Sequence, residues 1–124
     1  MDKIENPKLY DLEERTFQFS KNVALYVKQL PNNISNLEHG KQVVRSSGSI
    51  GANYIEANEA LSKKDFIMRI KICRKEAKES AYWLRLIVET NDEKYTKEGK
   101  LLFDEAIELK KIFSAILLNS KEDN

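Results

Sequence analysis

Five polar residues are spaced so that helices could bring them together: Arg45, Asn53, Glu56, Glu76 and Glu79. Paired carboxylates beside a cation are groups that general acid–base catalysis uses. The same groups also form charge-assisted pairs that fix how two helices align. Because no activated nucleophile accompanies them, we favour a structural polar network and assign no catalytic residue. The alternative is a carboxylate active site built from Glu56, Glu76 and Glu79.

Metal and thiol chemistry have few residues available. His39 is the single histidine and Cys73 the single cysteine, whereas a soft-metal site needs several such ligands. The Glu-x-x-His pattern of bundle metal sites is broken, because Asn36 stands three residues before His39. Cys73 falls on an apolar helical stripe, where we expect it to be buried and unreactive. We therefore expect no metal site and no cofactor.

The segment from Arg45 to Ala57 reads RSSGSIGANYIEA and lies inside a helical pattern despite its two glycines. Each glycine inside a helix costs roughly 1 kcal/mol relative to alanine. Keeping Gly48 and Gly51 is best explained by a neighbouring helix that approaches too closely for side chains. A phosphate-binding loop is not expected, since no lysine follows Gly51 and the surroundings are helical. We predict a slender central helix with a polar line along one side.

Four helices must position these residues. Apolar residues recur in steps of three and four along four segments, at approximately 11–30, 36–60, 63–91 and 97–119. Ser35 with Glu38, and Ser62 with Asp65, resemble the capping pairs that begin the second and third helices. Short connections make consecutive helices antiparallel neighbours. We therefore predict one all-α domain over residues 1–124, an antiparallel up-down-up-down four-helix bundle.

This topology predicts which polar residues meet. If the second and third helices pack side by side around a turn at 58–62, Glu56 should lie near Phe66. Arg45 should then lie level with the stretch that holds Glu76 and Glu79. An arginine facing either glutamate would form a charge-assisted pair.

The composition is that of a helical protein without a strong global charge. Of its 124 residues, 33% are charged and 41% are hydrophobic, and the formal net charge is +1. A chain of this length is one domain by the usual prior, and near-neutrality gives no global attraction to nucleic acid or membranes. No apolar run approaches the roughly 20 residues that span a bilayer, and the amino terminus lacks the apolar core of a signal peptide. We expect a cytoplasmic protein with no membrane partner.

Positive charge is concentrated locally on the third helix. Residues 61–92 hold eight lysines and arginines against five acidic residues. These cations wrap around the helix, which is typical of a solvated face. Contact with RNA or DNA phosphates is the second interpretation. The candidate nucleic-acid contacts are Lys63, Lys64, Arg69, Lys71, Arg74, Lys75 and Lys78.

Several large apolar residues fall outside the core stripes: Phe17, Leu25, Met68, Ile72, Tyr82, Trp83 and Leu86. Five of them belong to the third helix, and they include a tryptophan and a tyrosine. Such a concentration on one helix favours a second buried surface. We therefore expect a homo-oligomer, with these residues as its interface.

Four motifs occur in order along the chain: Arg45 to Ala57, Ser62 with Asp65-Phe66, Lys75-Glu-Ala-Lys-Glu79, and Tyr82-Trp-Leu-Arg-Leu86. With them, roughly residues 11–118 resemble the bacterial four-helix-bundle proteins related to the protein encoded within 23S ribosomal RNA intervening sequences. The resemblance implies a left-handed bundle that assembles into a ring, commonly a pentamer, with no established catalytic residues. A distant relative, the accessory protein of diversity-generating retroelements, looks like a basic pentameric barrel that binds nucleic acid and a reverse transcriptase.

These observations predict a non-enzymatic, homo-oligomeric helical bundle that binds RNA or a protein partner. A purely structural assembly subunit would form the oligomer and bind no ligand. The carboxylate enzyme would need an open pocket among its three glutamates, so a closed and paired network would argue against it.

Overall fold

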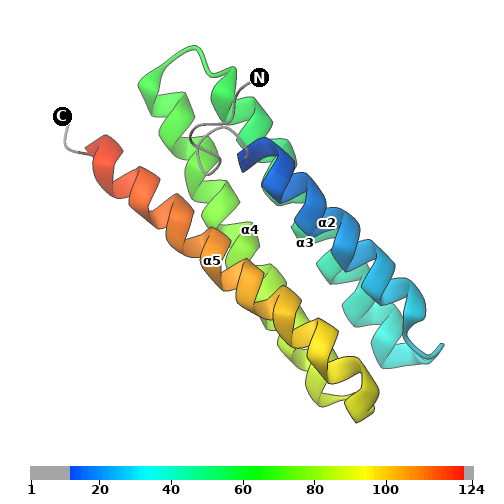
Figure 1. The fold of residues 1–124 in the computed structure, drawn as a ribbon. Coiled ribbons are helices and arrows are strands. Elements are labelled where there is room, and N and C mark those ends of the chain that lie inside the picture. The colour runs from blue at the N-terminus through cyan, green and yellow to red at the C-terminus, as the bar shows by residue number, and fades with distance from the viewer. Residues whose placement is uncertain (1–11, 122–124) are drawn as a thin grey trace, which may run out of the picture.

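The structure is a computed structural model that describes residues 12–121. Its elements are α2 (Leu12–Gln29), α3 (Ile34–Asn58), α4 (Lys63–Glu89), the 3-10 turn η1 (Glu93–Tyr95) and α5 (Thr96–Lys121). The helices are long rods that run alternately up and down, with the chain reversing at opposite ends (Figure 1). No strand occurs between residues 12 and 121. The predicted all-α four-helix bundle is confirmed.

The helices begin and end within about two residues of the predicted positions. The start of α3 differs because Asn33, and not Ser35, is its cap: Asn33 Oδ1 accepts from the Asn36 backbone N–H at 2.9 Å. The Ser62 cap of α4 is present, since its Oγ accepts from the Asp65 N–H at 3.0 Å. The predicted start of the first helix at residue 11 lies outside the described residues.

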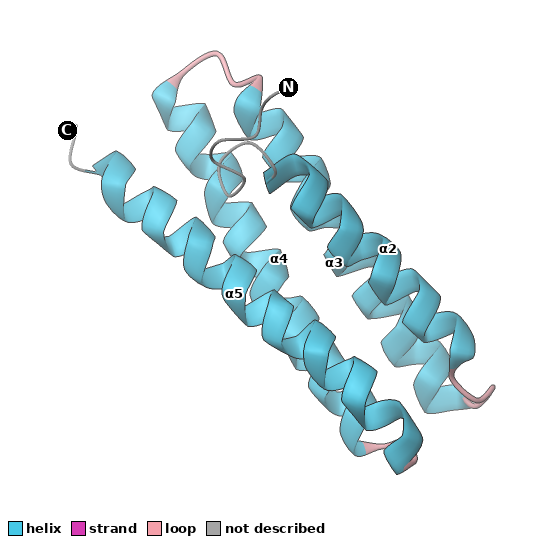
Figure 2. Cartoon of the chain, viewed as in Figure 1, coloured by secondary structure: helices cyan, strands magenta, loops and turns pink. Residues whose placement is uncertain are grey.

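The core runs along the bundle axis and takes one apolar stripe from each helix. Buried side chains recur in steps of three and four, as expected for amphipathic helices: Phe19, Val23 and Tyr26; Val43 and Ile50; Ile70, Cys73, Ala77, Leu84 and Ile87; Leu102, Ala106, Leu109 and Phe113. Short loops join the helices (Figure 2). Burial of each large aliphatic or aromatic side chain contributes about 1.5–3 kcal/mol, so these stripes hold the bundle together.

The close approach predicted for the glycine-containing segment is found against α2. A Cβ on Gly51 would lie 3.0 Å from Thr16 Oγ1, which is tighter than an ordinary contact. Gly48 is less constrained, because its nearest neighbour would be Ser20 Oγ at 3.6 Å. The segment is helical throughout, so Gly51 serves helix packing and not a loop.

Helix α2 packs mainly on α3, and two polar contacts join it to α5 and η1. Arg15 donates to both oxygens of Glu105 on α5, at 2.7 and 2.9 Å. This hydrogen-bonded carboxylate raises the pKa of Arg15. Tyr26 donates its hydroxyl to the Tyr95 carbonyl at 2.8 Å. These contacts hold α2 against α5, where the packing between the two helices is less extensive than that between α2 and α3.

Two asparagines exchange hydrogen bonds at the end of the bundle where α3 begins and α4 ends. Asn36 on α3 donates to Asn91 Oδ1 at 2.9 Å, and Asn91 donates back to Asn36 Oδ1 at 2.8 Å. Asn91 Nδ2 also donates to the Ile87 carbonyl, near the end of α4. Asn36 lies near the beginning of α3 and Asn91 just beyond the end of α4. Their hydrogen bonds therefore hold these two helix ends at the same level along the bundle axis.

Candidate functional site

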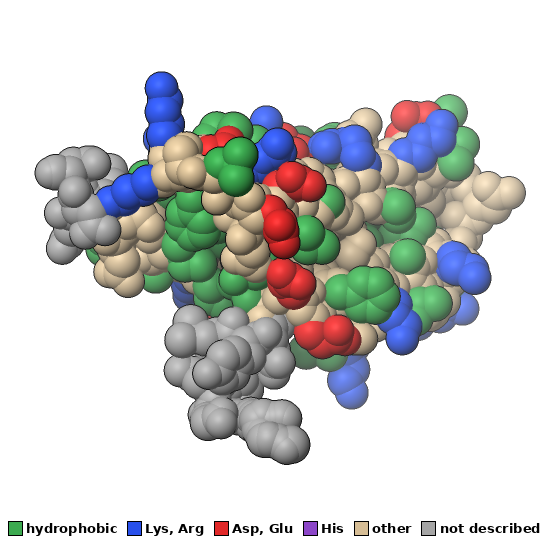
Figure 3. Space-filling view, turned by 90° about the horizontal axis from the view of Figure 1, so that it is seen from above, with side chains coloured by type: hydrophobic (Ala, Val, Ile, Leu, Met, Phe, Trp, Pro, Cys, Tyr) green, Lys and Arg blue, Asp and Glu red, His purple; other side chains and the backbone are tan. Residues whose placement is uncertain are grey.

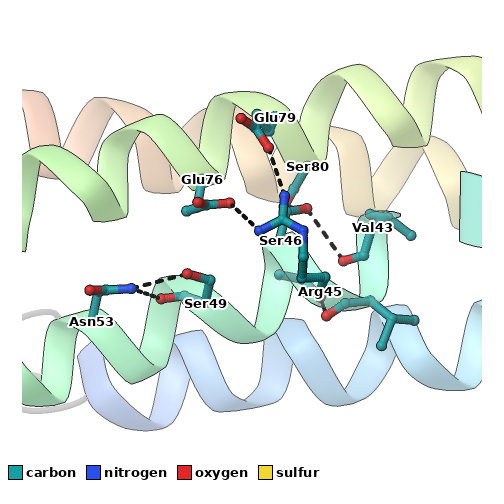
Figure 4. A network of polar contacts seen from close by, with 10 residues as sticks. Val43, Arg45, Ser46, Ser49, Asn53, Glu76, Glu79 and Ser80 are labelled. Atoms are coloured by element: carbon teal, nitrogen blue, oxygen red, sulfur yellow. Dashed lines mark hydrogen bonds and ion pairs between the residues drawn. The ribbon is translucent and has the colours of Figure 1, made fainter. Parts of the chain in front are cut away.

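Arg45 on α3 holds two carboxylates of α4 (Figure 4). Its Nη2 donates to Glu79 Oε1 at 2.9 Å, and its Nη1 donates to Glu76 Oε1 at 3.4 Å. Glu76 is buried at 6% exposure, whereas the Arg45 side chain is 53% exposed. The pairing expected from the antiparallel register is therefore present. Its main physical effect is to give the buried Glu76 carboxylate a cationic partner, since exposed ion pairs contribute only about 0–1 kcal/mol.

Two buried serines lie next to this pair, between the same helices. The hydroxyl oxygens of Ser46 and Ser80 are 2.8 Å apart, and both residues are fully buried. Ser46 also donates to the Val43 carbonyl at 3.4 Å (Figure 4). Neither serine is among the candidate polar residues that the sequence predicts. The Arg-Ser-Ser-Gly string was the available signal, because small hydroxyl residues allow close helix packing.

Asn53 belongs to a separate polar group further along α3. Arg69 of α4 donates to Asn53 Oδ1 at 2.9 Å, and Asn53 Nδ2 donates to the Ser49 carbonyl and hydroxyl at 2.9 and 3.0 Å. Glu56 is exposed and joins neither group. The five residues considered as one network are thus divided into the Arg45 group, the Asn53 group and a solvated Glu56.

This arrangement does not bring three carboxylates to one place. Glu76 and Glu79 both bind the guanidinium of Arg45. Glu56 lies about three helical turns further along α3 than Arg45. Within residues 12–121, no group of three or more histidine, cysteine or acidic residues could hold a metal ion. The geometry suits alignment of α3 with α4 better than proton transfer.

Cys73 lies in the core, as predicted. It is fully buried, and its thiol donates to the Ile50 carbonyl with an Sγ–O distance of 3.4 Å. Burial raises the pKa of the Cys73 thiol to about 12. A thiol with this pKa is almost wholly protonated near neutral pH and is a poor nucleophile.

The candidate basic residues do not form one surface. Arg74 and the exposed Lys71, Lys75 and Lys78 come together, and with Lys110 and Ser114 of α5 they line an open hollow of about 520 Å³. Lys63 and Lys64 line a second hollow with Ile67, Met68 and Lys71. Arg69 points instead toward α3, where it binds Asn53. Sequence reasoning missed Lys110 and Ser114, because nothing in a linear pattern shows how α5 is rotated against α4.

The candidate interface residues occupy two helices. Phe17 and Tyr82 are each 59% exposed, and Leu25 and Met68 are 44% and 43% exposed. Ile72 and Leu86 are half-buried. Apolar side chains reach the surface in patches between charged ones in the space-filling view (Figure 3). The structure adds exposed apolar residues on α3 that were not predicted, namely Leu37, Val44 and Ile55.

Trp83 lies at the edge of the core and not wholly outside it. The side chain is half-buried and packs against the core cluster. Its ring centroid lies 5.0 Å from that of Tyr82 and 5.8 Å from that of His39. Tyr82 is consequently the more accessible of the two aromatic residues for contact with another molecule.

Among the helices of residues 12–121, none combines the length and apolar character needed to cross a bilayer.

Comparison with known proteins confirms the resemblance carried by the four motifs. The family described as 23S rRNA-intervening sequence protein matches residues 10–115. The crystal structure of a protein with unknown function from the S23 ribosomal protein family of Bacteroides thetaiotaomicron is similar, with 33% sequence identity and a TM-score of 0.75. The similarity covers 85% of this chain and 96% of that one. None of the curated proteins matches the chain.

Proposed function

This chain belongs to the 23S rRNA-intervening sequence protein family, and from that premise we propose a non-enzymatic, self-assembling helical bundle that binds RNA on the basic side of α4. The observation that carries the proposal is that α4 exposes both an apolar stripe and a group of cations. A single copy of the chain covers neither. The apolar residues are suited to contact with a second copy of the chain, and the cations to contact with an anionic molecule.

The apolar stripe of α4 has the spacing of a helix-packing surface. Met68, Ile72, Tyr82 and Leu86 lie four, ten and four residues apart, so they form two apolar pairs on one face of the helix. Lys75 and Glu79 lie on the same face between the two pairs. Met68 and Tyr82 are exposed, and Ile72 and Leu86 are half-buried. Large apolar residues that reach the surface on one face mark interaction sites. We assign this stripe to contact between copies of the chain.

The positions of α2 and α4 favour a ring over a simple pair. The two helices occupy opposite corners of the bundle, since α3 packs against both of them (Figure 1). The exposed Phe17 and Leu25 of α2 therefore face away from the stripe of α4. Contact between two different surfaces on successive copies gives a closed ring when the rotation is right. A pentamer is the expected ring size from the family resemblance.

The carboxylate enzyme has less support. Its three glutamates are not gathered in one pocket, because Arg45 engages Glu76 and Glu79 while Glu56 stands apart in solvent. Glu76 and Glu79 are both engaged by Arg45, so neither is an unpaired carboxylate facing Glu56. We therefore retain the assembly and RNA-binding proposal.

Assembly is tested by measuring the mass in solution with light scattering. We expect the chain to form a multimer, and Met68→Lys with Tyr82→Lys to reduce it to a monomer with unchanged helical content. Leu101→Lys with Leu118→Lys is the matched control, because those residues of α5 are 62% and 63% exposed. The control should keep the multimer. A wild-type chain that stays monomeric at high concentration would overturn the assembly proposal.

RNA binding is tested with a fluorescently labelled RNA duplex at low salt. Phosphate contacts release counterions, so the affinity should fall steeply as salt increases. If no binding occurs at low salt, or if the affinity is independent of salt, the RNA half of the proposal is wrong.

A further inference from the structure

We propose that the hollow between α4 and α5 is the place where this protein holds a phosphodiester backbone, so that RNA is bound by its backbone and not by its bases. This inference rests on the proposed function and gives it a site. The lining residues are Lys71, Arg74, Lys75 and Lys78 of α4 with Lys110 and Ser114 of α5. Five are cations, and the sixth carries a hydroxyl.

Within the described part of the chain, the cations of the hollow lack the carboxylate partners that five other cations have. Arg15, Arg45, Arg85, Lys100 and Lys111 each pair with a glutamate or aspartate. Within residues 12–121, none of the five cations in the hollow makes such a pair. The positive charge there is not neutralised by the protein itself.

Their spacing makes the charges repel one another. Lys71 and Lys75, and likewise Arg74 and Lys78, are four residues apart on the same helix. Each like-charge pair at this spacing destabilises a helix by about 0.2–0.5 kcal/mol. An anion placed in the hollow would reverse this repulsion, because it would attract cations from both helices at once.

The shape favours a polymer over a single small anion. Lys71 and Lys78 are seven residues apart, which corresponds to about 10 Å along a helix. The charges are therefore spread along the hollow and do not converge on one point. The hollow is also open to solvent, with a volume of about 520 Å³. A chain of regularly spaced phosphates matches such a surface.

The chemistry of the lining favours the backbone of a nucleic acid over its bases. Lysine, arginine and serine are common phosphate-binding side chains, and arginine can donate two parallel hydrogen bonds to one phosphate. In the described part of the chain, no aromatic residue on which an unpaired base could stack lines the hollow. Among residues 12–121, no asparagine, glutamine or acidic residue lines it to recognise base edges, and its lysines and arginine can bind phosphate as well as guanine. Binding should consequently be independent of sequence.

Ser114 gives the site a means of preferring RNA over DNA. Of the described residues, it is the only one with a neutral polar side chain that lines the hollow. A hydroxyl can both donate to and accept from the ribose 2′-hydroxyl, which DNA lacks. The cations supply most of the affinity, and Ser114 supplies the discrimination.

The test compares charge reversals of equal size at two places on the full-length chain. Lys75→Glu with Lys78→Glu alters the hollow, and Lys28→Glu with Lys41→Glu changes the net charge equally at exposed lysines of α2 and α3. We expect the hollow variant to lose at least about tenfold in affinity for a labelled RNA duplex, and to show a weaker salt dependence. The matched control should bind like the wild type. Circular dichroism checks that both variants remain folded.

Each result of this test decides something. If the wild type binds RNA but both charge reversals weaken binding equally, the hollow is not the site, although the proposed function stands. If the wild type does not bind RNA at low salt, the RNA half of the proposed function fails as well. If polyglutamate displaces the RNA more effectively than an unlabelled RNA duplex does, the hollow serves an acidic protein surface and the inference is overturned. Ser114→Ala should reduce the preference for RNA over a DNA duplex of the same sequence, and an unchanged preference would remove Ser114 from the site.

Discussion

The hydroxyl oxygens of Ser46 on α3 and Ser80 on α4 lie 2.8 Å apart in the interior, and neither residue is exposed to solvent. Two small side chains that satisfy each other allow the helices to approach closely. The Arg45 pair with Glu76 and Glu79 joins the same two helices nearby (Figure 4). The α3–α4 contact is therefore polar both in its interior and at its edge, and this polar pattern fixes how the two helices align.

We expect the two serines to be energetically coupled. Ser80→Ala removes a hydrogen bond and leaves Ser46 less well satisfied, which should lower the free energy of unfolding by about 1–3 kcal/mol. Once Ser46→Ala is present, the second substitution should cost less, with a coupling of at least about 0.5 kcal/mol. Urea denaturation of the two single variants and the double variant measures this coupling.

The control for that cycle combines Ser46→Ala with Ser120→Ala. Ser120 donates to the Ile116 carbonyl of its own helix at 2.8 Å and is not bonded to Ser46. The effects of these two substitutions should add. Additive effects for Ser46 and Ser80 as well would mean that their contact has no energetic value.

Gly99 should be the least replaceable glycine of the bundle. A Cβ at this position would overlap the Tyr26 hydroxyl and the Val88 side chain. Overpacking of this kind typically costs about 1–3 kcal/mol, so Gly99→Ala should lower the free energy of unfolding by that amount. Thermal denaturation followed by circular dichroism measures the change.

Gly48→Ala is the matched substitution for comparison. Its new Cβ would lie 3.6 Å from Ser20 Oγ, an ordinary contact. Because alanine is the better helix former by roughly 1 kcal/mol, the variant should be as stable as the wild type or more so. If Gly48→Ala destabilises the protein as much as Gly99→Ala, the space around the added Cβ does not determine the effect of these substitutions.

Stability should decrease at alkaline pH because two buried acids are held in their neutral forms. Burial raises the pKa of Cys73 from 9.0 to about 12, and that of Tyr26 from 10.0 to about 12. The unfolded chain therefore releases these protons at lower pH than the folded chain does. The free energy of unfolding should be unaffected by these groups below pH 9.0 and should fall as the pH rises toward about 12.

Urea denaturation at a series of pH values tests this dependence, with Tyr26→Phe as the comparison. The variant has no phenol to ionise, so its stability should decline less steeply above pH 10.0. It also lacks the hydrogen bond to the Tyr95 carbonyl and should be less stable at neutral pH. Parallel pH profiles for the two proteins would show that Tyr26 ionises equally easily in the folded and unfolded chains.

Much of the fold could be read from local patterns. The steps of three and four through Phe19, Val23 and Tyr26 identified the buried face of α2, and the same period did so for the other helices. The cost of glycine in a helix correctly pointed to a close helix contact at Gly51. The antiparallel register also placed Arg45 beside Glu76 and Glu79.

Other features depended on contacts between segments that are distant along the chain. The sequence groups Arg69 with the basic residues, but its side chain turns toward α3, where Asn53 accepts its hydrogen bond. The helical period puts Trp83 outside the core stripe, but its side chain packs at the edge of the core beside His39 of α3. Gly99 was not singled out, because the residues that exclude a side chain there, Tyr26 and Val88, come from two other helices.

Residue order alone determined that the chain forms four amphipathic helices, which face of each is buried, and that consecutive helices run antiparallel. These properties follow from the helical period and from short connections, both of which are local. Only the tertiary structure decided how each helix is rotated about its axis and shifted along its neighbours. That rotation, set by side chains interlocking between helices, is what brings Lys110 and Ser114 of α5 to the lysines of α4.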